Sequence, residues 1–408
     1  MKKVIISLLV AGAAVAANAQ DKALLETLVK KGMLTQQEAA QIAKDSVAVT
    51  PATKSTKSIK IFGGGQGWYS WGKNSVKSGT ASFDQQSGFT LRYVKLGVEA
   101  DVGGGWSAEV VTDFGTEGAS KNYLDKVVAS KKIDLDYING TLQLGLRKVN
   151  MGYEQNMDDF GQLAVERSVA TYFFTRYEGK NFGSRTVGAF WDGNITQVDG
   201  LYYGAAVTSG VSEGGVTNFI TDAQDSSALS FWANAGYKNV ADVKGETLSY
   251  DLGVNFGYAP QGMTTYDRKG SVWGINPYAT LNWRGLTLIG EFFLQQAEDY
   301  APGRDGVGRT PMGANFTAAY KMDIGEWGAL EPVFRASYVS TNGMGLRSAY
   351  SGDDLGDINQ AMTFYGGVNW YATTAVKTSL GYEFGYYDQG DAVVERVYGN
   401  TVLSLIHI

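Results

Sequence analysis

The sequence alternates apolar and polar residues in about sixteen short segments, and the gaps between these segments are alternately short and long. In one of the clearest segments, Val94, Leu96 and Val98 alternate with Lys95 and Glu99. A period of two places the two sets on opposite faces of a β-strand. The polar set is charged in nearly every segment, so this face of the strand must contact water. The opposite, apolar face then needs an apolar environment of its own. This pattern predicts a transmembrane β-barrel of the outer-membrane type, with lipid on one face and water on the other.

The segments divide the chain after residue 57 into sixteen expected antiparallel strands, which makes the expected fold all-β. They run over residues 58–72, 88–102, 105–115, 131–139, 140–149, 184–193, 199–210, 227–239, 246–258, 271–283, 285–297, 313–323, 328–340, 359–371, 373–387 and from 391 to the end. Asn139–Gly140 is typical of a two-residue hairpin turn, and Arg284–Gly285 is another short connection. Most of the remaining connections are long. Sixteen strands with alternately short turns and long loops are typical of a water-filled outer-membrane channel.

Composition agrees with an all-β chain and excludes several other classes. The 408 residues include 53 glycines and only 6 prolines, and 12% are aromatic, as packed strands and tight turns require. No run of ~18 or more apolar residues is present, so no membrane-spanning helix is expected. Cysteine is absent, which excludes disulfides and thiolate metal sites. The net charge of -6 argues against nucleic acid as a partner.

The N-terminus has the features of a cleaved signal peptide over residues 1–19. Lys2 and Lys3 precede a short apolar core, and the small residues Ala17 and Ala19 form an A-x-A cleavage site. A signal of this kind predicts export from the cytoplasm. Together with the barrel pattern, it predicts that the chain resides in the cell outer membrane.

Three further regions follow the signal peptide. Residues 20–45 are expected to form a short helical segment in the periplasm, in which Thr35 and Glu38 make a capping box. Residues 46–57 are rich in Ser, Thr and Lys and are expected to be a linker. Residues 58–402 are the expected barrel domain.

The last six residues, 403–408, break the alternation and contain the chain's one histidine. They back-translate as CTG TCT CTT ATA CAC ATC, which resembles a transposon end sequence used in sequencing-library adapters. We therefore expect residues 403–408 to be a non-native tail and the closing strand to be cut short.

The sequence offers no credible catalytic or metal-binding residues. Most hydrolases built on barrels need a nucleophile with a histidine base or paired acids, and the one histidine lies in the tail, so no enzyme activity is expected. The acid pairs Asp158–Asp159 and Asp353–Asp354 are expected to be solvated loop residues. Because the sequence contains no ~12-residue calcium loop pattern, we expect neither a metal site nor a cofactor.

Residues 24–39 read LLETLVKKGMLTQQEA, residues 144–154 read LGLRKVNMGYE and residues 165–168 read VERS. In order and spacing these segments resemble the phosphate-selective porin family (porin O/P-like). The chain departs from the family pattern at Leu146, where an aromatic residue is usual, and at Met151, where proline is usual. The resemblance implies a sixteen-stranded homotrimeric channel with one loop folded into the pore.

The longest connection, residues 150–183, is the expected pore constriction, because long loops are usually functional. The candidate constriction residues are Arg147, Lys148, Glu154, Glu166, Arg167, Arg176, Lys180 and Arg185. In a narrow waist of low dielectric, a few such charges select ions. Alternatively, they pair with one another and hold the loop against the barrel wall. The sequence leaves both interpretations open.

Further charged residues are expected on the lumen face of the strands by alternation. These are Lys95, Glu99, Glu109, Asp113, Asp134, Asp136 and Arg335. Acidic residues outnumber basic residues on this face, and acidic rings favour cations. The sequence therefore supports a porin more directly than a phosphate-selective porin.

Taken together, these features predict passive diffusion of small hydrophilic solutes and inorganic anions through a barrel embedded in outer-membrane lipid. A preference for anions or phosphate is the narrower expectation. The alternative is a structural or adhesive barrel whose long outer loops bind a partner.

Overall fold

The computed structural model describes residues 58–76, 86–116, 123–175, 182–183, 185–209, 229–260, 271–298, 308–342, 360–387 and 392–405. The expected signal peptide, helical segment and linker lie outside the described residues, as do residues 406–408. By its contacts the chain divides into two units, Met1–Ile59 with Ala100–Gly104, and Lys60–Glu99 with Gly105–Ile408. In the first unit only the ends of two strands are described. The second unit contains the remainder of the sheet.

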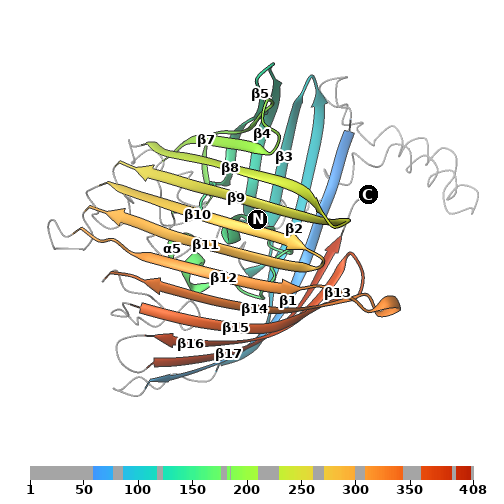
Figure 1. The fold of residues 1–408 in the computed structure, drawn as a ribbon, viewed down its shortest axis with the longest axis vertical. Helices are drawn as coiled ribbons and strands as arrows, with labels where there is room; N and C mark the ends of the chain where they lie inside the picture. The colour runs from blue at the N-terminus through green and yellow to red at the C-terminus, as the bar shows by residue number, and fades with distance from the viewer. Residues whose placement is uncertain are drawn as a thin grey trace, which may run out of the picture. The chain divides into compact units, whose positions relative to one another are not determined.

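The chain forms one antiparallel sheet (Figure 1). Its strands are β1 Ser58–Val76, β2 Gln86–Gly103, β3 Trp106–Asp113, β4 Leu124–Asp134, β5 Ile138–Lys148, β6 Arg185–Ile195, β7 Leu201–Ser209, β8 Leu229–Val243, β9 Glu246–Ala259, β10 Val272–Trp283, β11 Leu286–Ala297, β12 Met312–Tyr320, β13 Met322–Asp323, β14 Ala329–Ser340, β15 Gln360–Tyr371, β16 Val376–Tyr387 and β17 Ala392–Leu405. Three short helices are described: α4 Tyr153–Asn156, α5 Val169–Thr175 and the 3-10 helix η1 Gly325–Trp327. Among the described residues, no helix is both long enough and apolar enough to cross a membrane.

The strand pairings close the sheet on itself. β12 and β13 both pair with β14 and are two parts of one strand, which leaves sixteen strands. Each strand pairs with the next along the chain, and β1 also pairs with β17, from Gly63 opposite Leu405 to Val76 opposite Ala392. The predicted sixteen-stranded antiparallel barrel is therefore confirmed.

The final strand includes residues of the expected non-native tail. Leu403, Ser404 and Leu405 continue β17 and pair with residues 63–65 of β1. The strand expected from residue 391 onward is thus described as far as Leu405, and the domain boundary at residue 402 stays a prediction. A non-native origin of residues 403–408 stays a prediction.

Short turns and longer loops alternate around the barrel, as predicted. Lys244–Gly245 joins β8 to β9 and Arg284–Gly285 joins β10 to β11, and all four residues have positive φ, between 49° and 80°. Two consecutive residues with positive φ form a type I′ turn, whose twist matches that of antiparallel strands. The two turns fix the register of both hairpins, with Val243 opposite Glu246 in the first.

The predicted hairpin turn at Asn139–Gly140 is wrong. Both residues lie inside β5, where Gly140 is opposite Ile133, and the chain turns at residues 135–137 instead. A Cβ at Gly140 would lie 2.6 Å from the carbonyl oxygen of Asp192 on the neighbouring strand. The glycine is thus needed for close packing of β5 against β6 and not for a turn.

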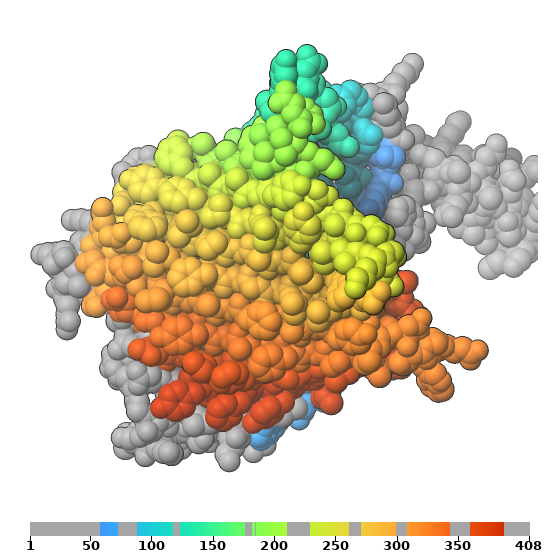
Figure 2. All heavy atoms as spheres, in the orientation of Figure 1, coloured from blue at the N-terminus to red at the C-terminus, as the bar shows by residue number. Residues whose placement is uncertain are grey.

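The two faces of the sheet differ in polarity. Phe292, Phe316, Phe334 and Phe364 lie on neighbouring strands and are 39–48% exposed on the outer face. The residues beside them in sequence, Glu291, Asn315, Arg335 and Thr363, are buried on the inner face. Figure 2 shows part of the outer surface, over the strands coloured yellow to red. An apolar exterior around a polar interior is typical of a barrel that contacts lipid.

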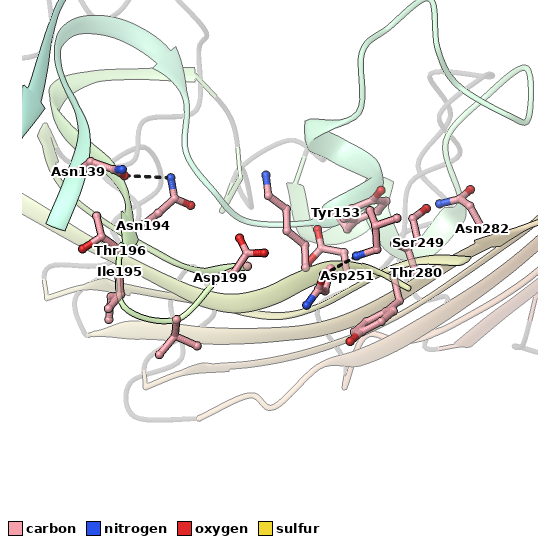
Figure 3. Close-up of a pocket in the computed structure, with 16 residues that line it drawn as sticks. Asn139, Tyr153, Asn194, Ile195, Thr196, Asp199, Ser249, Asp251, Thr280 and Asn282 are labelled. Carbon is pink, nitrogen blue, oxygen red and sulfur yellow. Dashed lines mark hydrogen bonds between the residues drawn. The ribbon is translucent and has the colours of Figure 1, made fainter. Parts of the chain in front are cut away.

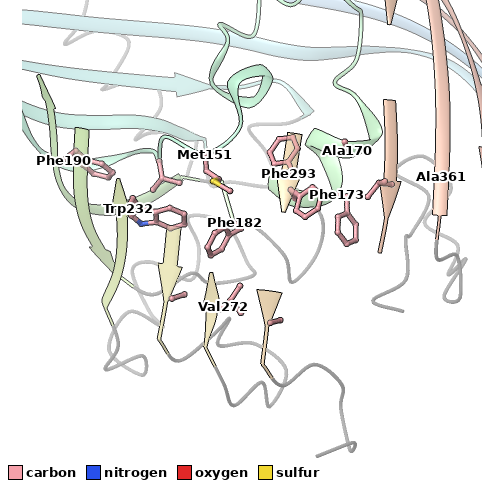
Figure 4. Packing of buried hydrophobic residues seen from close by; sticks show 14 residues of the cluster. Met151, Ala170, Phe173, Phe182, Phe190, Trp232, Val272, Phe293 and Ala361 are labelled. Atoms are coloured by element: carbon pink, nitrogen blue, oxygen red, sulfur yellow. The ribbon is translucent and has the colours of Figure 1, made fainter. Parts of the chain in front are cut away.

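The interior holds an apolar cluster formed between the segment that joins β5 to β6 and the barrel wall. Phe174 of α5 stacks on Phe293 of β11 with ring centroids 4.9 Å apart, and Phe182 lies 5.0 Å from the ring of Trp232 on β8. Met151 is buried in the same cluster (Figure 4). Each buried aromatic side chain stabilises this packing by ~1.5–3 kcal/mol.

Candidate channel constriction

The described part of the segment between β5 and β6, residues 149–175 and 182–183, lies inside the barrel and is hydrogen-bonded to strands far away in sequence. The backbone nitrogen of Gly152 donates to Asn276 of β10 over 3.1 Å. Farther along the segment, Asn369 of β15 donates to the carbonyl oxygen of Leu163 over 2.9 Å, and Lys377 of β16 to that of Gln162 over 2.7 Å. We call these described residues, 149–175 and 182–183, the inner loop. That the segment 150–183 narrows a pore stays a prediction.

One end of the inner loop is held by a buried group, the Arg335 anchor, which comprises Arg335, Glu154 and Glu383. Arg335 of β14 donates to Glu154 of α4 over 3.0 Å and to Glu383 of β16 over 2.7 Å. The other oxygen of Glu154 accepts from the backbone nitrogen and hydroxyl of Ser168, over 3.0 and 2.7 Å. Burial by itself raises the pKa of Glu154, but Arg335 and Ser168 outweigh it, so the pKa lies below its ordinary value.

Glu291 of β11 extends this anchor to the loop backbone. Its carboxylate accepts from the backbone nitrogens of Tyr153 and Glu154, over 2.7 and 3.3 Å. The Asn315 amide donates to Glu291 over 2.8 Å and to Ser168 over 2.9 Å. The bonds from Tyr153 and Glu154 satisfy two of the N–H groups at the start of α4, which have no partner within the helix.

A second buried group, the Asp159 anchor, comprises Asp125, Asp159, Lys95, Lys148, Arg167 and Arg185. Asp159 forms ion pairs with Lys95, Arg167, Lys148 and Arg185, the last two over 3.5 and 3.9 Å. Its side chain is only 2% exposed. Burial by itself raises the pKa of Asp159, but the charges of Lys148, Arg167, Lys95 and Arg185 outweigh it, so the pKa lies well below its ordinary value.

Asp125 completes the Asp159 anchor from the wall. It pairs with Lys95 over 2.9 Å and with Arg185. The register of β3 against β4 shifts between Val111 and Thr112, which leaves Asp125 as the extra residue of a bulge. A bulge redirects a side chain, and here it brings Asp125 to the lumen side.

A third contact joins the loop to β2. Arg92 pairs with Glu166 over 2.7 Å, and its guanidinium lies 4.2 Å from the centre of the Trp68 ring. Nearby, the Tyr365 hydroxyl accepts from the backbone nitrogen of Val165 over 3.4 Å. The inner loop is thus attached to the wall at β2, β10, β11 and β14–β16.

The structure brings the described constriction candidates into ion pairs. Lys148, Arg167 and Arg185 belong to the Asp159 anchor, Glu154 to the Arg335 anchor, and Glu166 pairs with Arg92. Arg147 pairs with Asp192 and also donates to Asn150 over 2.9 Å. Arg176 and Lys180 lie outside the described residues. This arrangement favours the interpretation that the charges hold the loop; a role in ion selection stays a prediction.

The predicted lumen residues occupy several different environments. Lys95 and Arg335 are anchor residues, and Glu109 pairs with Lys126 over 2.6 Å. Asp113 is buried and accepts from the backbone nitrogens of Val94 and Gly115, over 2.9 and 3.0 Å. It therefore stabilises the backbone where β2 and β3 meet.

The last three predicted lumen residues are exposed to solvent. Glu99 lies in β2 and Asp134 is the last residue of β4, and their place on the lumen face stays a prediction. Asp136, however, lies in the turn after β4 and not on a strand face, so its predicted position is wrong. The physical reason is that the chain turns at residues 135–137 and not, as predicted, at Asn139–Gly140.

Sequence reasoning missed the centre of the Asp159 anchor. It interpreted Asp158–Asp159 as solvated, and Asp159 is one of the most buried acids. Arg92 and Asn315 were not singled out either. The available signal was the number of cations near residues 147, 167 and 185, which need carboxylate partners if they are buried.

A cavity of about 930 Å³ lies between α4 and the short-turn end of β6–β10. Figure 3 shows Asn139, Asn194 and Thr196 on one side of it, and Tyr153 and Asp251 on another. Asn194 donates to Asn139 over 3.4 Å. The lining is mostly polar, in contrast to the apolar cluster around α5.

No protein-family model and no curated protein sequence matches this chain. Solved structures do match. The anion-selective porin from Comamonas acidovorans has 13% identity and a TM-score of 0.56, over 85% of this chain and 99% of that chain. Salmonella typhi OmpF, in complex with daunomycin, has 14% identity and a TM-score of 0.57, over 86% and 98%. OmpT of Vibrio cholerae, in a trimer form, has 10% identity and a TM-score of 0.50, over 85% and 99%. At these identities the likeness concerns the fold, and the chain has the barrel fold of outer-membrane porins.

Proposed function

We propose that the protein is an outer-membrane porin through which small hydrophilic solutes and ions diffuse passively. The observation that carries this proposal is the inner loop, which buried ion pairs attach to the inner wall of a barrel with an apolar exterior. A loop fixed inside a barrel narrows the path without moving parts. The porin fold of the similar structures supports the same function.

The proposed mechanism is size exclusion at the inner loop, combined with electrostatic filtering. A preference for small anions, phosphate included, is the narrower part of the proposal. It is supported by the Asp159 anchor, where four cations surround two carboxylates among the described residues. An excess of positive charge at a waist of low dielectric attracts anions.

We further propose that the protein is exported by a cleaved signal peptide and assembles as a homotrimer. The exposed apolar residues of the outer face support contact with lipid and with neighbouring copies. Chemical crosslinking of the protein in native membranes tests the assembly, because a trimer gives a band at three times the monomer mass.

The test of the function is conductance in planar lipid bilayers under a KCl gradient. A porin gives discrete conductance steps, and an anion-preferring porin gives a reversal potential of the anion-selective sign. Steps with a zero or cation-selective potential would retain the porin and reject the anion preference. Protein that inserts without any steps would reject the channel and favour the structural or adhesive barrel.

A further inference from the structure

The cavity between α4 and the short-turn end is lined mainly by uncharged side chains that both donate and accept hydrogen bonds. Amides come from Asn139, Asn194 and Asn282, and hydroxyls come from Ser249 and Thr280. An amide or hydroxyl can donate to and accept from the same partner molecule. A lining of this kind matches a solute that carries hydroxyl groups on most of its carbon atoms.

Asp251 gives the cavity a fixed acceptor. Its carboxylate accepts from the Tyr202 hydroxyl over 2.7 Å, and Tyr202 is hydrogen-bonded in turn to Tyr278. The Tyr202 hydroxyl can lie close to the wall only because Gly236 and Gly253 have no side chain, since a Cβ at either position would overlap it. A carboxylate held in one orientation binds a hydroxyl donor with less loss of entropy than a mobile one.

Tyr153 adds an apolar surface at the side formed by α4. Its ring is partly exposed and lies 4.8 Å from the ring of Tyr278. An aromatic ring buries C–H groups well, while its hydroxyl keeps a polar contact. The cavity therefore offers an apolar surface for the C–H groups on the face of a sugar ring and hydrogen-bond partners for the hydroxyl groups at its edge.

Other classes of solute fit this cavity less well. Anion sites commonly use arginine in bidentate contacts, and none of the described residues that line the cavity is arginine. Among these described lining residues Lys238 is the one cation, and it is outnumbered by Asp199 and Asp251. The volume of about 930 Å³ lies within the usual range of ~300–1,000 Å³ for small-molecule sites.

We propose that this cavity binds a neutral polyhydroxylated solute, such as a mono- or disaccharide, on its passage through the channel. The inference rests on the proposed porin function, because it places the cavity on the diffusion path. It differs from the proposed anion preference, which is assigned to the Asp159 anchor.

Calorimetric titration of the full-length, detergent-solubilised protein with maltose tests the site directly. Inorganic phosphate and tetraethylene glycol serve as comparison probes, the latter being rich in acceptors but nearly without donors. We expect saturable binding of maltose that Asp251→Asn weakens about tenfold, because a hydrogen bond to a charged acceptor is lost. Glu246→Gln is the matched control on the same strand, since Glu246 forms an exposed pair with Arg284 outside the cavity.

Circular dichroism and resistance to unfolding on unheated gels establish that each variant is folded, and Asn194→Ala provides a second cavity variant. No saturable maltose binding, tighter binding of phosphate than of maltose, or equal effects of Asp251→Asn and Glu246→Gln would each overturn the site. Conductance measured on the same preparation separates the two proposals. Conductance steps without maltose binding reject only the site, and maltose binding without steps rejects only the channel.

Discussion

At the scale of single residues, several charged side chains of the interior are both buried and paired. Arg335 is 1% exposed and contacts two carboxylates that belong to different segments of the chain. Such a pair contributes little compared with a well-packed apolar contact, yet removal of one partner leaves a charge buried without compensation. The anchors therefore make the loop position sensitive to single substitutions.

Arg335→Met should lower the free energy of unfolding by ~3–5 kcal/mol, because Glu154 and Glu383 would stay buried without their cation. Arg284→Met removes an ion pair with Glu246, in which the two side chains are 49% and 48% exposed. This substitution should change the free energy of unfolding by only ~0–1 kcal/mol. Urea unfolding in lipid vesicles, followed by tryptophan fluorescence, measures both. Equal shifts for the two variants would contradict the anchor.

The pH dependence of the loop follows from the carboxylates of the two anchors. The folded pKa values of Asp159 and Glu154 lie below their ordinary values of 3.8 and 4.5. The two carboxylates therefore stabilise the folded protein fully above these ordinary values, and this stabilisation is lost as the pH falls through the folded pKa values. Single-channel current should stay steady from neutral pH down to about pH 5 and become noisy only in stronger acid.

Asp159→Asn is the control for this pH prediction. It removes the central carboxylate, so the current should be noisy already at neutral pH. A change of the wild-type current centred near pH 6.5, where histidine ordinarily titrates, would contradict the assignment to these carboxylates.

At the scale of elements, hairpins and glycines determine how closely neighbouring strands approach. The two type I′ turns fix two hairpins locally. In β5, by contrast, a Cβ at Gly140 would clash with the carbonyl oxygen of Asp192 and the ring of Trp191. Position 140 requires glycine because of β6, a strand that follows it by some fifty residues in sequence. No pattern in the sequence around Gly140 indicates this requirement.

Gly140→Ala should destabilise the barrel by ~1–3 kcal/mol, since the added methyl group has no space without a shift of β6. Gly290→Ala in β11 is the matched control, because no atom lies within 4 Å of the position of its Cβ. The same urea titration compares the two. A Gly140→Ala protein as stable as Gly290→Ala would show that the strands separate easily at this position.

At the scale of the whole molecule, the barrel places apolar residues outside and polar residues inside, the reverse of a water-soluble protein. The alternation of Phe334 with Arg335 on one strand shows this in two adjacent residues. A barrel of this kind depends on lipid to solvate its outer face.

Phe334→Arg should impair insertion into bilayers by up to ~2–4 kcal/mol, depending on its depth, because it places a charge in lipid. Trp327→Arg, in the exposed η1 turn, should have a much smaller effect. Refolding into lipid vesicles, followed by the mobility of unheated samples on gels, measures the folded fraction. Equal folding of the two variants would mean that Phe334 does not face lipid.

The sequence by itself determined the number of strands, the alternation of apolar and polar residues along them and the alternation of turns and loops. A period of two and turn residues such as Arg284–Gly285 are local properties, and a closed sheet repeats them around its circumference. The resemblance to porins also indicated a loop inside the lumen. These predictions needed no knowledge of which strands lie opposite one another.

Only the tertiary structure decided what the charges of the inner loop do. Glu154 pairs with Arg335, 181 residues away, and Asp159 with Lys95, 64 residues away. Asp159 looks like a solvated turn residue in sequence because its four cations come from β2, the loop itself and the ends of β5 and β6. Burial and pairing of a charge depend on which distant segments meet around it, and closure of the barrel brings those segments together.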